Sequence, residues 1–161
     1  MFSVCPTVVL DKEHFECITI HGGYLVKIES SSENNFIVQE AKRHHAPDTQ
    51  NNKIFFFLPS IAKPQLPVVS NRLINIVEIR DHNYGYWIGG SDIEVEGEYI
   101  WMKSKHPFDF TDWAARQPDN QRHEDCVHLN GNYGFRWNDA PCSLKAYYIC
   151  EKPEPEVDII G

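Results

Sequence analysis

The sequence predicts a single α+β domain, and two features of its patterning carry this prediction. A helical pattern with an apolar face lies in the first third of the 161 residues, and short aromatic or β-branched runs follow in the second half. A helix followed by strands is typical of α+β folds. A third feature, five cysteines spread along the chain, indicates that disulfides staple the fold. A chain of this length forms about one domain and can bury a real core.

The helix is predicted from a capping signal and an apolar face. Ser30 stands at the N-cap with Glu33 three residues later, which is the pattern of a capping box. Three apolar residues then follow along one side: Phe36, Ile37 and Ala41. We expect this helix to end near Arg43. Ahead of it, residues 21–26 indicate a turn into a short strand, and a weaker helical pattern covers 11–20.

Five later segments predict strands, because they are short, aromatic or β-branched, and separated by turn residues. They are residues 86–90, 98–102, 126–129, 135–137 and 146–150. The four tryptophans could form a surface for stacking on carbohydrate. We interpret most of them as core residues instead, because large aromatic side chains are mostly buried.

Residues 44–83 differ from the rest of the chain, because they lack a sustained period and carry three prolines between 59 and 67. A loop of this length is uncommon inside a compact domain. We therefore interpret this segment as an insertion that the fold does not require. The domain is predicted over 17–151. Before it lies an irregular segment, 1–16, without the basic start of a signal peptide, and after it an acidic tail, 152–161.

The composition argues against several classes of function. A formal net charge of −8, with a pI near 5.4 and no basic block, disfavours binding to nucleic acid or to anionic membrane surfaces. No apolar run reaches the roughly 20 residues that span a bilayer. The sequence has no Gly-x-Ser-x-Gly or other nucleophile motif. Carboxylates that share a cation stay ionised and are poor proton donors for glycoside hydrolysis. We expect a binding protein and not an enzyme.

The cysteines predict a disulfide framework. None of them forms a Cys-x-x-Cys pair, so thioredoxin-like redox chemistry and the usual zinc-finger spacings are absent. Cys17 and Cys150 lie near the two ends, whereas Cys126 and Cys142 flank a segment rich in glycine and asparagine. These four residues permit three sets of pairings, and free buried thiols in a cytosolic protein are the alternative. Cys5 is left over and could join two chains into a homo-oligomer, which would raise avidity.

Oxygen-bearing side chains gather in pairs in the second half of the sequence, and together they predict a calcium site. The pairs are Gln117 and Asp119 around Pro118, Glu124 and Asp125 before Cys126, Asn138 and Asp139 after Trp137, and Asp92 with Glu96. Calcium binds roughly 6–8 oxygen atoms. These ligands are oxygen atoms, and no two histidines have the spacing of metal ligands on a helix. This combination favours calcium over zinc or copper. For any single pair the alternative is a solvated acidic surface, and we interpret His44 and His45 as solvated residues.

Several of these motifs follow one another in a characteristic order. They are Trp87-Ile88-Gly89-Gly90, Gln117-Pro118-Asp119, Glu124-Asp125-Cys126, Trp137-Asn138-Asp139, Cys142 and Cys150. This order closely resembles the C-type lectin domain, over roughly residues 17–43 and 84–151. Residues 87–113 especially resemble secreted mollusc lectins of the perlucin type. The resemblance implies a secreted chain with a C-type lectin-like fold: two helices, antiparallel sheets and a long calcium-binding loop region.

The resemblance also implies the disulfide pairings and the calcium ligands. The pairings are Cys17 with Cys150 and Cys126 with Cys142. One calcium position would be held by Gln117, Asp119, Glu124, Asn138 and Asp139, with Pro118 in the cis form. A second calcium position would be held by Asp92, Glu96, Glu124 and Asp125. Asn120 stands where the family usually has a further aspartate for this second position.

The function implied by the resemblance is calcium-dependent carbohydrate binding, in innate recognition or in the extracellular matrix. Sugar hydroxyls would contact both the ion and the side chains of Gln117, Asp119, Glu124 and Asn138. Tyr133 is a candidate for packing against the sugar. Glutamine before and aspartate after the proline favour galactose or N-acetylgalactosamine, and mannose-type ligands remain possible. The alternative is the same fold binding a protein or mineral surface, with calcium in a structural role only.

Overall fold

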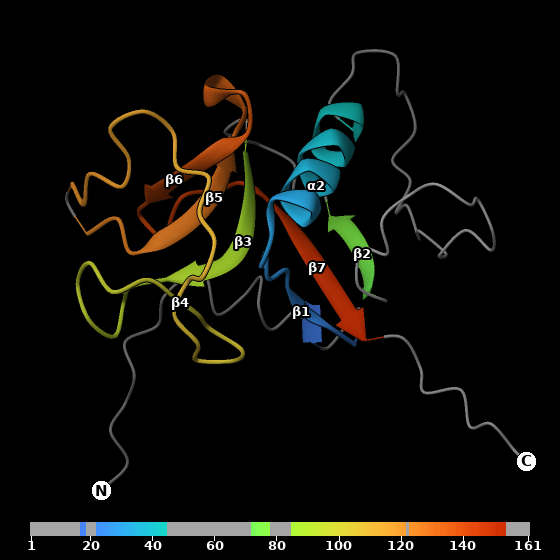
Figure 1. Ribbon diagram of the computed structural model, residues 1–161, viewed down its shortest axis with the longest axis horizontal. Helices are drawn as coiled ribbons and strands as arrows, with labels where there is room; N and C mark the ends of the chain where they lie inside the picture. The colour runs from blue at the N-terminus through green and yellow to red at the C-terminus, as the bar shows by residue number, and fades with distance from the viewer. Residues whose placement is uncertain (1–16, 19–21, 45–71, 78–84, 122, 154–161) are drawn as a thin grey trace, which may run out of the picture.

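The computed structural model describes residues 17–18, 22–44, 72–77, 85–121 and 123–153 (Figure 1). The elements, in chain order, are β1 (Tyr24–Leu25), α2 (Ser31–His44), β2 (Arg72–Val77), β3 (Gly85–Ser91), β4 (Ile100–Trp101), β5 (Cys126–Asn130), the 3-10 helix η1 (Gly131–Tyr133), β6 (Arg136–Ala140) and β7 (Tyr147–Pro153). The predicted α+β class is confirmed. The segment 1–16 with Cys5, and residues 154–161 of the predicted tail, lie outside the described residues.

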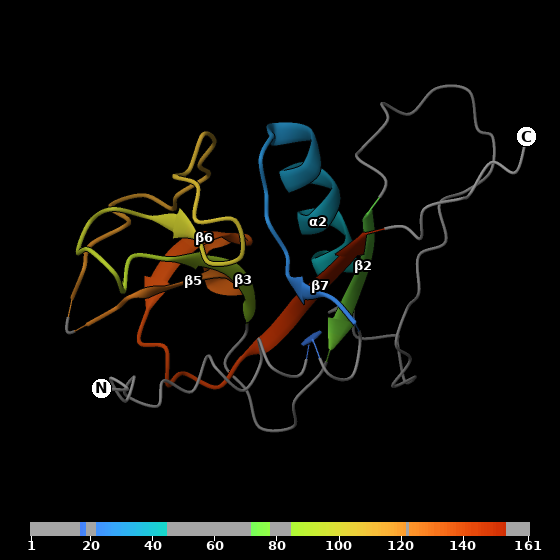
Figure 2. The same ribbon diagram turned by 90° about the horizontal axis from the view of Figure 1, so that it is seen from below.

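Strand β7 is central to the seven-stranded mixed sheet. One edge of β7 pairs with all six residues of β2, over Tyr148–Pro153. Its other edge pairs antiparallel with β1 and parallel with β3. From β3 the sheet continues through β5 to β6, and β4 pairs with the end of β3. Figures 1 and 2 show that β7 links the part of the molecule beside α2 with the part formed by β3 to β6 and their loops.

Helix α2 begins where the capping signal predicts. The Glu33 backbone nitrogen donates to Ser30 Oγ at 3.3 Å, and the Glu29 backbone nitrogen donates to the Glu33 carboxylate at 2.7 Å. The Glu33 side chain thus satisfies the nitrogen one position before the N-cap, a small variation on the usual capping box. Ile37 and Ala41 on the predicted apolar face are buried in the main core.

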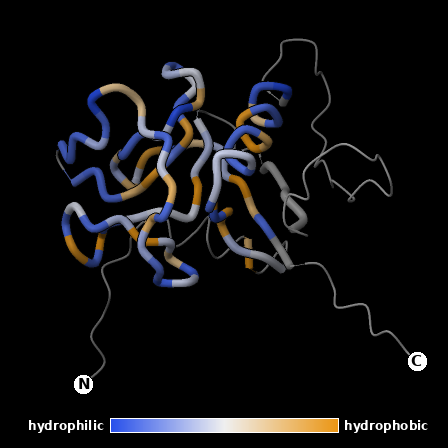
Figure 3. The backbone as a smooth tube through the Cα atoms, in the orientation of Figure 1, coloured by the Kyte–Doolittle hydropathy of each residue, from blue (hydrophilic) through white to orange (hydrophobic). Residues whose placement is uncertain are grey.

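The interior consists of two apolar clusters. The larger one joins the buried face of α2 to strands β3, β5, β6 and β7, and it contains Trp101 and Trp137. The smaller one contains Trp87 and both disulfides. These three tryptophans are at most 2% exposed, and Trp113 packs against the larger cluster, so the prediction of core tryptophans is confirmed. Figure 3 shows hydrophobic residues on α2 and mostly hydrophilic ones along the loops beside β5 and β6.

Both implied disulfides are present. Cys17 pairs with Cys150 on β7, and Cys126 at the start of β5 pairs with Cys142 just after β6. Of the second predicted helix, only residues 17–18 are described, and both are helical.

Strand β2 corrects the interpretation of residues 44–83. Residues Arg72–Val77 pair with β7 at six positions, so the prediction of an irregular segment is wrong for this stretch. Its isoleucines and valine carry β propensity. The pairing partner lies at the far end of the chain, however, where no local pattern can reveal it. His44 belongs to α2, and 45–71 and 78–84 lie outside the described residues. Whether the fold requires the segment stays a prediction.

Two other predicted strands are shorter or shifted. Of residues 98–102 only Ile100–Trp101 form β4, because Glu98 closes a turn by donating its backbone N–H to the Val95 carbonyl. Strand β6 begins at Arg136 since Phe135 has a φ of 67°, which is not an extended conformation. Among the described residues, no helix combines the length and apolar character that crossing a bilayer requires.

Candidate functional site

The candidate site forms where the loop over residues 117–125 meets strand β6. The loop leads directly into β5, so Glu124 and Asp125 lie just before the first residue of that strand. Strand β6 pairs with β5 in a register that sets Asp139 opposite Val127. A carboxylate from the loop and one from β6 are thereby brought to the same end of the strand pair.

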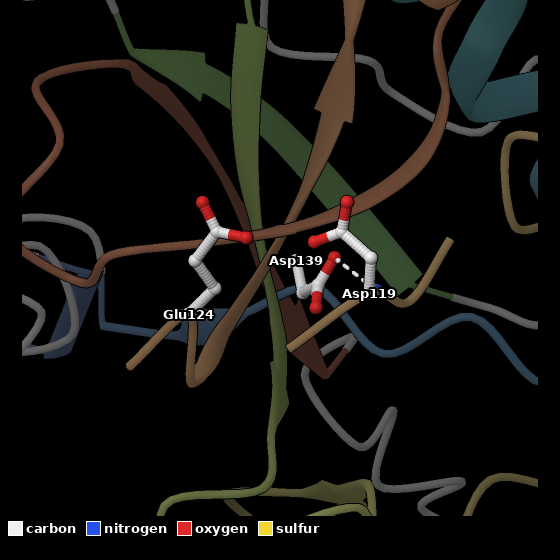
Figure 4. Close-up of side chains that lie close together, drawn as sticks. All are labelled: Asp119, Glu124 and Asp139. Carbon is white, nitrogen blue, oxygen red and sulfur yellow. Dashed lines mark hydrogen bonds between the residues drawn. The ribbon is translucent and has the colours of Figure 1, made fainter. Parts of the chain in front are cut away.

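Three carboxylates converge at this point. Asp119, Glu124 and Asp139 each contribute an oxygen, and these oxygens lie within 4.8 Å of one another. Figure 4 shows the three side chains directed toward one another, Glu124 from one side and Asp119 from the other. Asp139 is fully buried, Glu124 is half-buried and Asp119 is exposed. Within the described residues this is the one group of three or more acidic, histidine or cysteine side chains with metal-ligand spacing.

Asp139 holds the loop in place. Its carboxylate accepts hydrogen bonds from the backbone nitrogens of Asp119 at 3.3 Å and Asn120 at 2.7 Å. The Tyr99 hydroxyl lies 3.4 Å from the same carboxylate and donates to Asn120 Oδ1 at 2.7 Å. Burial, and then the charges of Asp139 and Asp92, raise the pKa of Tyr99 well above its usual range, so its hydroxyl stays protonated.

The loop backbone adopts energetically costly conformations. Arg116, Asn120 and His123 have positive φ values of 70°, 49° and 63°. Non-glycine residues persist in this region only where surrounding contacts hold them, and such residues concentrate at functional sites. For Asn120, the bonds to Asp139 and Tyr99 are contacts of this kind.

The Glu124 carboxyl binds a proton unusually tightly. Burial, a hydrogen bond to Asp119 and the charges of Asp139 and Asp119 raise its pKa to about 7. Neighbouring like charges disfavour ionisation, whereas a bound cation favours it. The group therefore has the electrostatics of a site that a positive charge would stabilise.

Gln117 and Asp119 lie together beside Pro118. The Gln117–Pro118 peptide bond is cis, as the family resemblance implies. Gln117 Nε2 donates to Asp119 Oδ2 at 3.2 Å, and the Asp119 backbone nitrogen donates to Gln117 Oε1 at the same distance. Gln121 Nε2 also donates to Asp119 Oδ2, at 3.1 Å. An amide and a carboxylate are thus held adjacent at the edge of the carboxylate group.

Asn138 is beside Asp139 on β6, but its amide nitrogen is engaged with protein groups. It donates to the Asp139 backbone carbonyl and lies 3.1 Å from His128 Nε2. His128 is 3% exposed, and burial lowers its pKa to about 4, so the ring is neutral at pH 7. This histidine was not among the site residues predicted from the sequence. Its register position opposite Asn138 is the feature that links it to the site.

The side chains predicted for a second calcium position do not form a group with metal-ligand spacing in the described part of the chain. Asp92 is 1% exposed and accepts from the Gly97 backbone nitrogen at 2.9 Å through Oδ2. Its Oδ1 atom is buried without a hydrogen-bond partner in the structure. Asp125 contributes its backbone carbonyl, which accepts from Ser91 Oγ at 2.7 Å, and Glu96 is exposed.

Tyr133 lies on η1, between β5 and β6, and is 49% exposed. No described contact joins it to the three carboxylates. The contacts of Tyr99 with Asn120 and Asp139 were not predicted from the sequence, because Tyr99 looks there like an ordinary aromatic strand residue. The nearest signal is its place a few residues after Asp92, in a loop that already carried predicted ligands.

Comparison with known families matches residues 57–152 to the Lectin C-type domain, which is more than half of the chain. The chain belongs to the C-type lectin family. The matched range begins inside the segment that we interpreted as an insertion. Members of the family bind ligands and are not enzymes, which confirms the expectation from the sequence.

This C-type lectin domain is similar to several known proteins. It is 29% identical to a perlucin-like protein of Mytilus galloprovincialis over 84% of the chain and 64% of that protein. It is 44% identical to an alpha-N-acetylgalactosamine-specific lectin of Patiria pectinifera over 42% of the chain and 40% of that protein. The chain thus spans less than two thirds of these relatives. Among solved structures, herring type II antifreeze protein matches with a TM-score of 0.58 and 25% identity, covering 91% of this chain and 84% of the other.

Proposed function

We propose that this C-type lectin domain binds glycans through a calcium ion held by Gln117, Asp119, Glu124, Asn138 and Asp139. The observation that carries the proposal is the convergence of three carboxylates, Asp119, Glu124 and Asp139, with oxygens within 4.8 Å of one another. Two disulfides are typical of an oxidising compartment, and we infer that the domain acts outside the cell.

The donor set fits calcium. Carboxylate oxygens are the hard ligands that calcium prefers, and the group contains neither sulfur nor imidazole. Gln117 adds an amide oxygen next to Asp119, and Asn138 adds another beside Asp139. Asp139 is buried and Asp119 is exposed, so an ion between them would be held on the protein side and open to a ligand on the solvent side.

The same side chains suit the recognition of sugar hydroxyls. A bound calcium would supply coordination positions for two neighbouring hydroxyl groups. Carboxylates of Asp119 and Glu124 can accept the hydroxyl protons, whereas the amide nitrogens of Gln117 and Asn138 can donate to the hydroxyl oxygens. In this structure the Gln117 amide donates to Asp119 instead, so a sugar would exchange that bond for one of its own.

We infer a preference for galactose or N-acetylgalactosamine. Glutamine before and aspartate after Pro118 supports this choice, as does similarity to the lectin of Patiria pectinifera that is named for N-acetylgalactosamine. Tyr133 is exposed and available for packing against a sugar from the neighbouring turn. A second calcium position at Asp92, Glu96, Glu124 and Asp125 is also part of the proposal, supported by the unpartnered buried Oδ1 of Asp92.

The test is a glycan array probed with the chain in calcium and in EDTA. Galactose-type hits that disappear in EDTA are expected. Asp119→Asn should lose them, and the matched control Asp109→Asn, an exposed acid outside the carboxylate group, should keep them. Hits that persist in EDTA would contradict the proposed mechanism.

The rival function is binding of a protein or mineral surface, with calcium in a structural role. An array without sugar hits, together with calcium-dependent stability and retention on a protein or carbonate surface, would favour this rival. Exposed Ile93 and Val95, beside Asp92, would then be the first residues to replace in search of the contact surface.

A further inference from the structure

The Tyr99 hydroxyl lies at the junction of the two loops that carry predicted calcium ligands. The ring is fixed by its aromatic neighbours, since it packs edge-on against Trp113 at 4.9 Å and in a tilted arrangement against Phe108 at 5.8 Å between ring centroids. This packing directs the hydroxyl toward Asn120 and Asp139, at 2.7 and 3.4 Å. The orientation of the hydroxyl is therefore set by the core and not by the loop it contacts.

Asn120 is held at both its side chain and its backbone. Tyr99 donates to its side-chain oxygen, and its backbone nitrogen donates to Asp139 at 2.7 Å. Asn120 has a φ of 49°, in the left-handed region that few residues other than glycine adopt and that asparagine adopts more readily than most. Its two partners hold it in this conformation. The preceding residue, Asp119, is one of the three converging carboxylates, so the position of Asn120 determines where this carboxylate lies.

We propose that Tyr99 is a positioning residue for the calcium site, holding Asn120 so that Asp119 faces Glu124 and Asp139 before the ion binds. This inference rests on the proposed function, because it concerns the same site. The physical reason is preorganisation: a loop that is already in the bound conformation loses less conformational freedom when the ligand arrives. The unexpected asparagine in the loop thereby acquires a role, as the acceptor that Tyr99 requires.

The experiment is a calorimetric titration with calcium chloride alone. It compares the unchanged protein with Tyr99→Phe, both in the metal-free form. Phenylalanine keeps the ring packing and removes one hydroxyl. We expect calcium affinity to fall about fivefold, as for the loss of one hydrogen bond. The matched control is Tyr24→Phe, which removes a hydroxyl from β1, outside the site, and should leave calcium affinity unchanged.

Two further measurements distinguish positioning from a general structural role. In an Asn120→Ala background, Tyr99→Phe should cause no additional loss of calcium affinity, because the acceptor is already gone. In EDTA, the melting temperatures of Tyr99→Phe and Tyr24→Phe should be similar. A lower melting temperature for Tyr99→Phe with unchanged calcium affinity would overturn the inference.

Failure of this inference can be told apart from failure of the proposed function. If the unchanged chain binds calcium and Tyr99→Phe binds it equally well, only the role of Tyr99 is wrong. If the unchanged chain binds no calcium, the proposed function is wrong, and this inference falls with it.

Discussion

The indole nitrogen of Trp137 donates a 2.8 Å hydrogen bond to the side-chain oxygen of Asn34, a residue of helix α2 that is 103 positions away in the chain. The Asn34 amide nitrogen donates in turn to Asp112 at 2.9 Å. Asn34 is 3% exposed, so one buried amide joins the helix, strand β6 and Asp112, which lies in the segment between β4 and β5. Trp137 directly precedes the Asn138–Asp139 pair, and this bond therefore anchors the strand that carries the site.

Replacing Asn34 by alanine should destabilise the fold by about 2 kcal/mol, because the buried indole N–H and the Asp112 carboxylate each lose a partner. Urea denaturation measures this loss. Asn35→Ala is the matched control, since Asn35 is an exposed neighbour on the same helix and should cost only a few tenths of that amount. Equal stability of the two variants would show that the Asn34 bonds contribute nothing.

Calcium affinity should decrease as the pH falls through about 7. The proximity of Asp119 and Asp139, together with burial, raises the pKa of Glu124 to about 7, so below that pH a proton competes with calcium for its carboxylate. We expect calcium affinity to fall about fivefold between pH 7 and pH 6, because one proton competes with the ion at a pKa of about 7. Calorimetric titration at pH 8, 7 and 6 measures it, and Glu124→Gln should bind weakly without that dependence. An affinity that is constant from pH 8 to 6 would refute the prediction.

Lowering the pH should stabilise the metal-free protein through Glu124, although it weakens calcium binding. Its pKa in the fold lies above the unfolded value, so its contribution to stability is present below about pH 4.5 and is lost as the pH rises to about 7. In EDTA, the melting temperature at pH 5 minus that at pH 7 should therefore be lower for Glu124→Gln than for the unchanged chain. The reverse ordering would mean that the carboxyl is not destabilised by its neighbours.

His128 should make the fold sensitive to mild acid. Burial lowers its pKa to about 4, below the value of about 6.5 in an unfolded chain. The unfolded chain takes up the proton first as the pH falls, so stability is lost between about pH 6.5 and 4, by about 1–2 kcal/mol at pH 5. Urea denaturation of His128→Asn should therefore show no such loss of stability between pH 7 and pH 5. His106→Asn, at an exposed histidine, is the control and should keep the original profile.

Exchanging the groups around Pro118, as Gln117→Glu with Asp119→Asn, should move the glycan preference from galactose-type toward mannose-type sugars. The exchange keeps one amide and one carboxylate beside Pro118. It reverses which of the two sugar hydroxyls donates to the carboxylate. Competitive elution with free galactose and mannose measures the preference. If the double variant kept its galactose preference with calcium affinity intact, the order of the pair would not determine the choice.

The sequence predicted those parts of the fold that local patterns specify. The Ser30 cap, the buried face with Ile37 and Ala41, and the short aromatic strands were all readable, because each depends on residues close together in the chain. The disulfide pairings were not derivable from spacing and came only from the family resemblance. Strand β2 was missed because its partner, β7, is distant in sequence and its own run shows no alternation.

The ligand residues of the site could be predicted from the sequence, but the contacts that hold them in place could not. Asp119, Glu124 and Asp139 were all named as ligands, and the structure brings their oxygens together. Asp92 and Glu96 were named as well, but no described group joins them into a second set. The contribution of Tyr99 depends on ring packing against Trp113 and Phe108, and the neutral state of His128 depends on its burial. Both are properties of the packed core that residue spacing does not encode.

The central claim is that Asp119, Glu124 and Asp139 together hold one calcium ion. A crystal structure of the chain grown with calcium, with anomalous diffraction to locate the ion, tests this most directly. We expect an anomalous peak contacted by oxygens of all three side chains, with the Gln117 amide oxygen beside it. No peak between these carboxylates at saturating calcium, or a peak bound only by other residues, would contradict it.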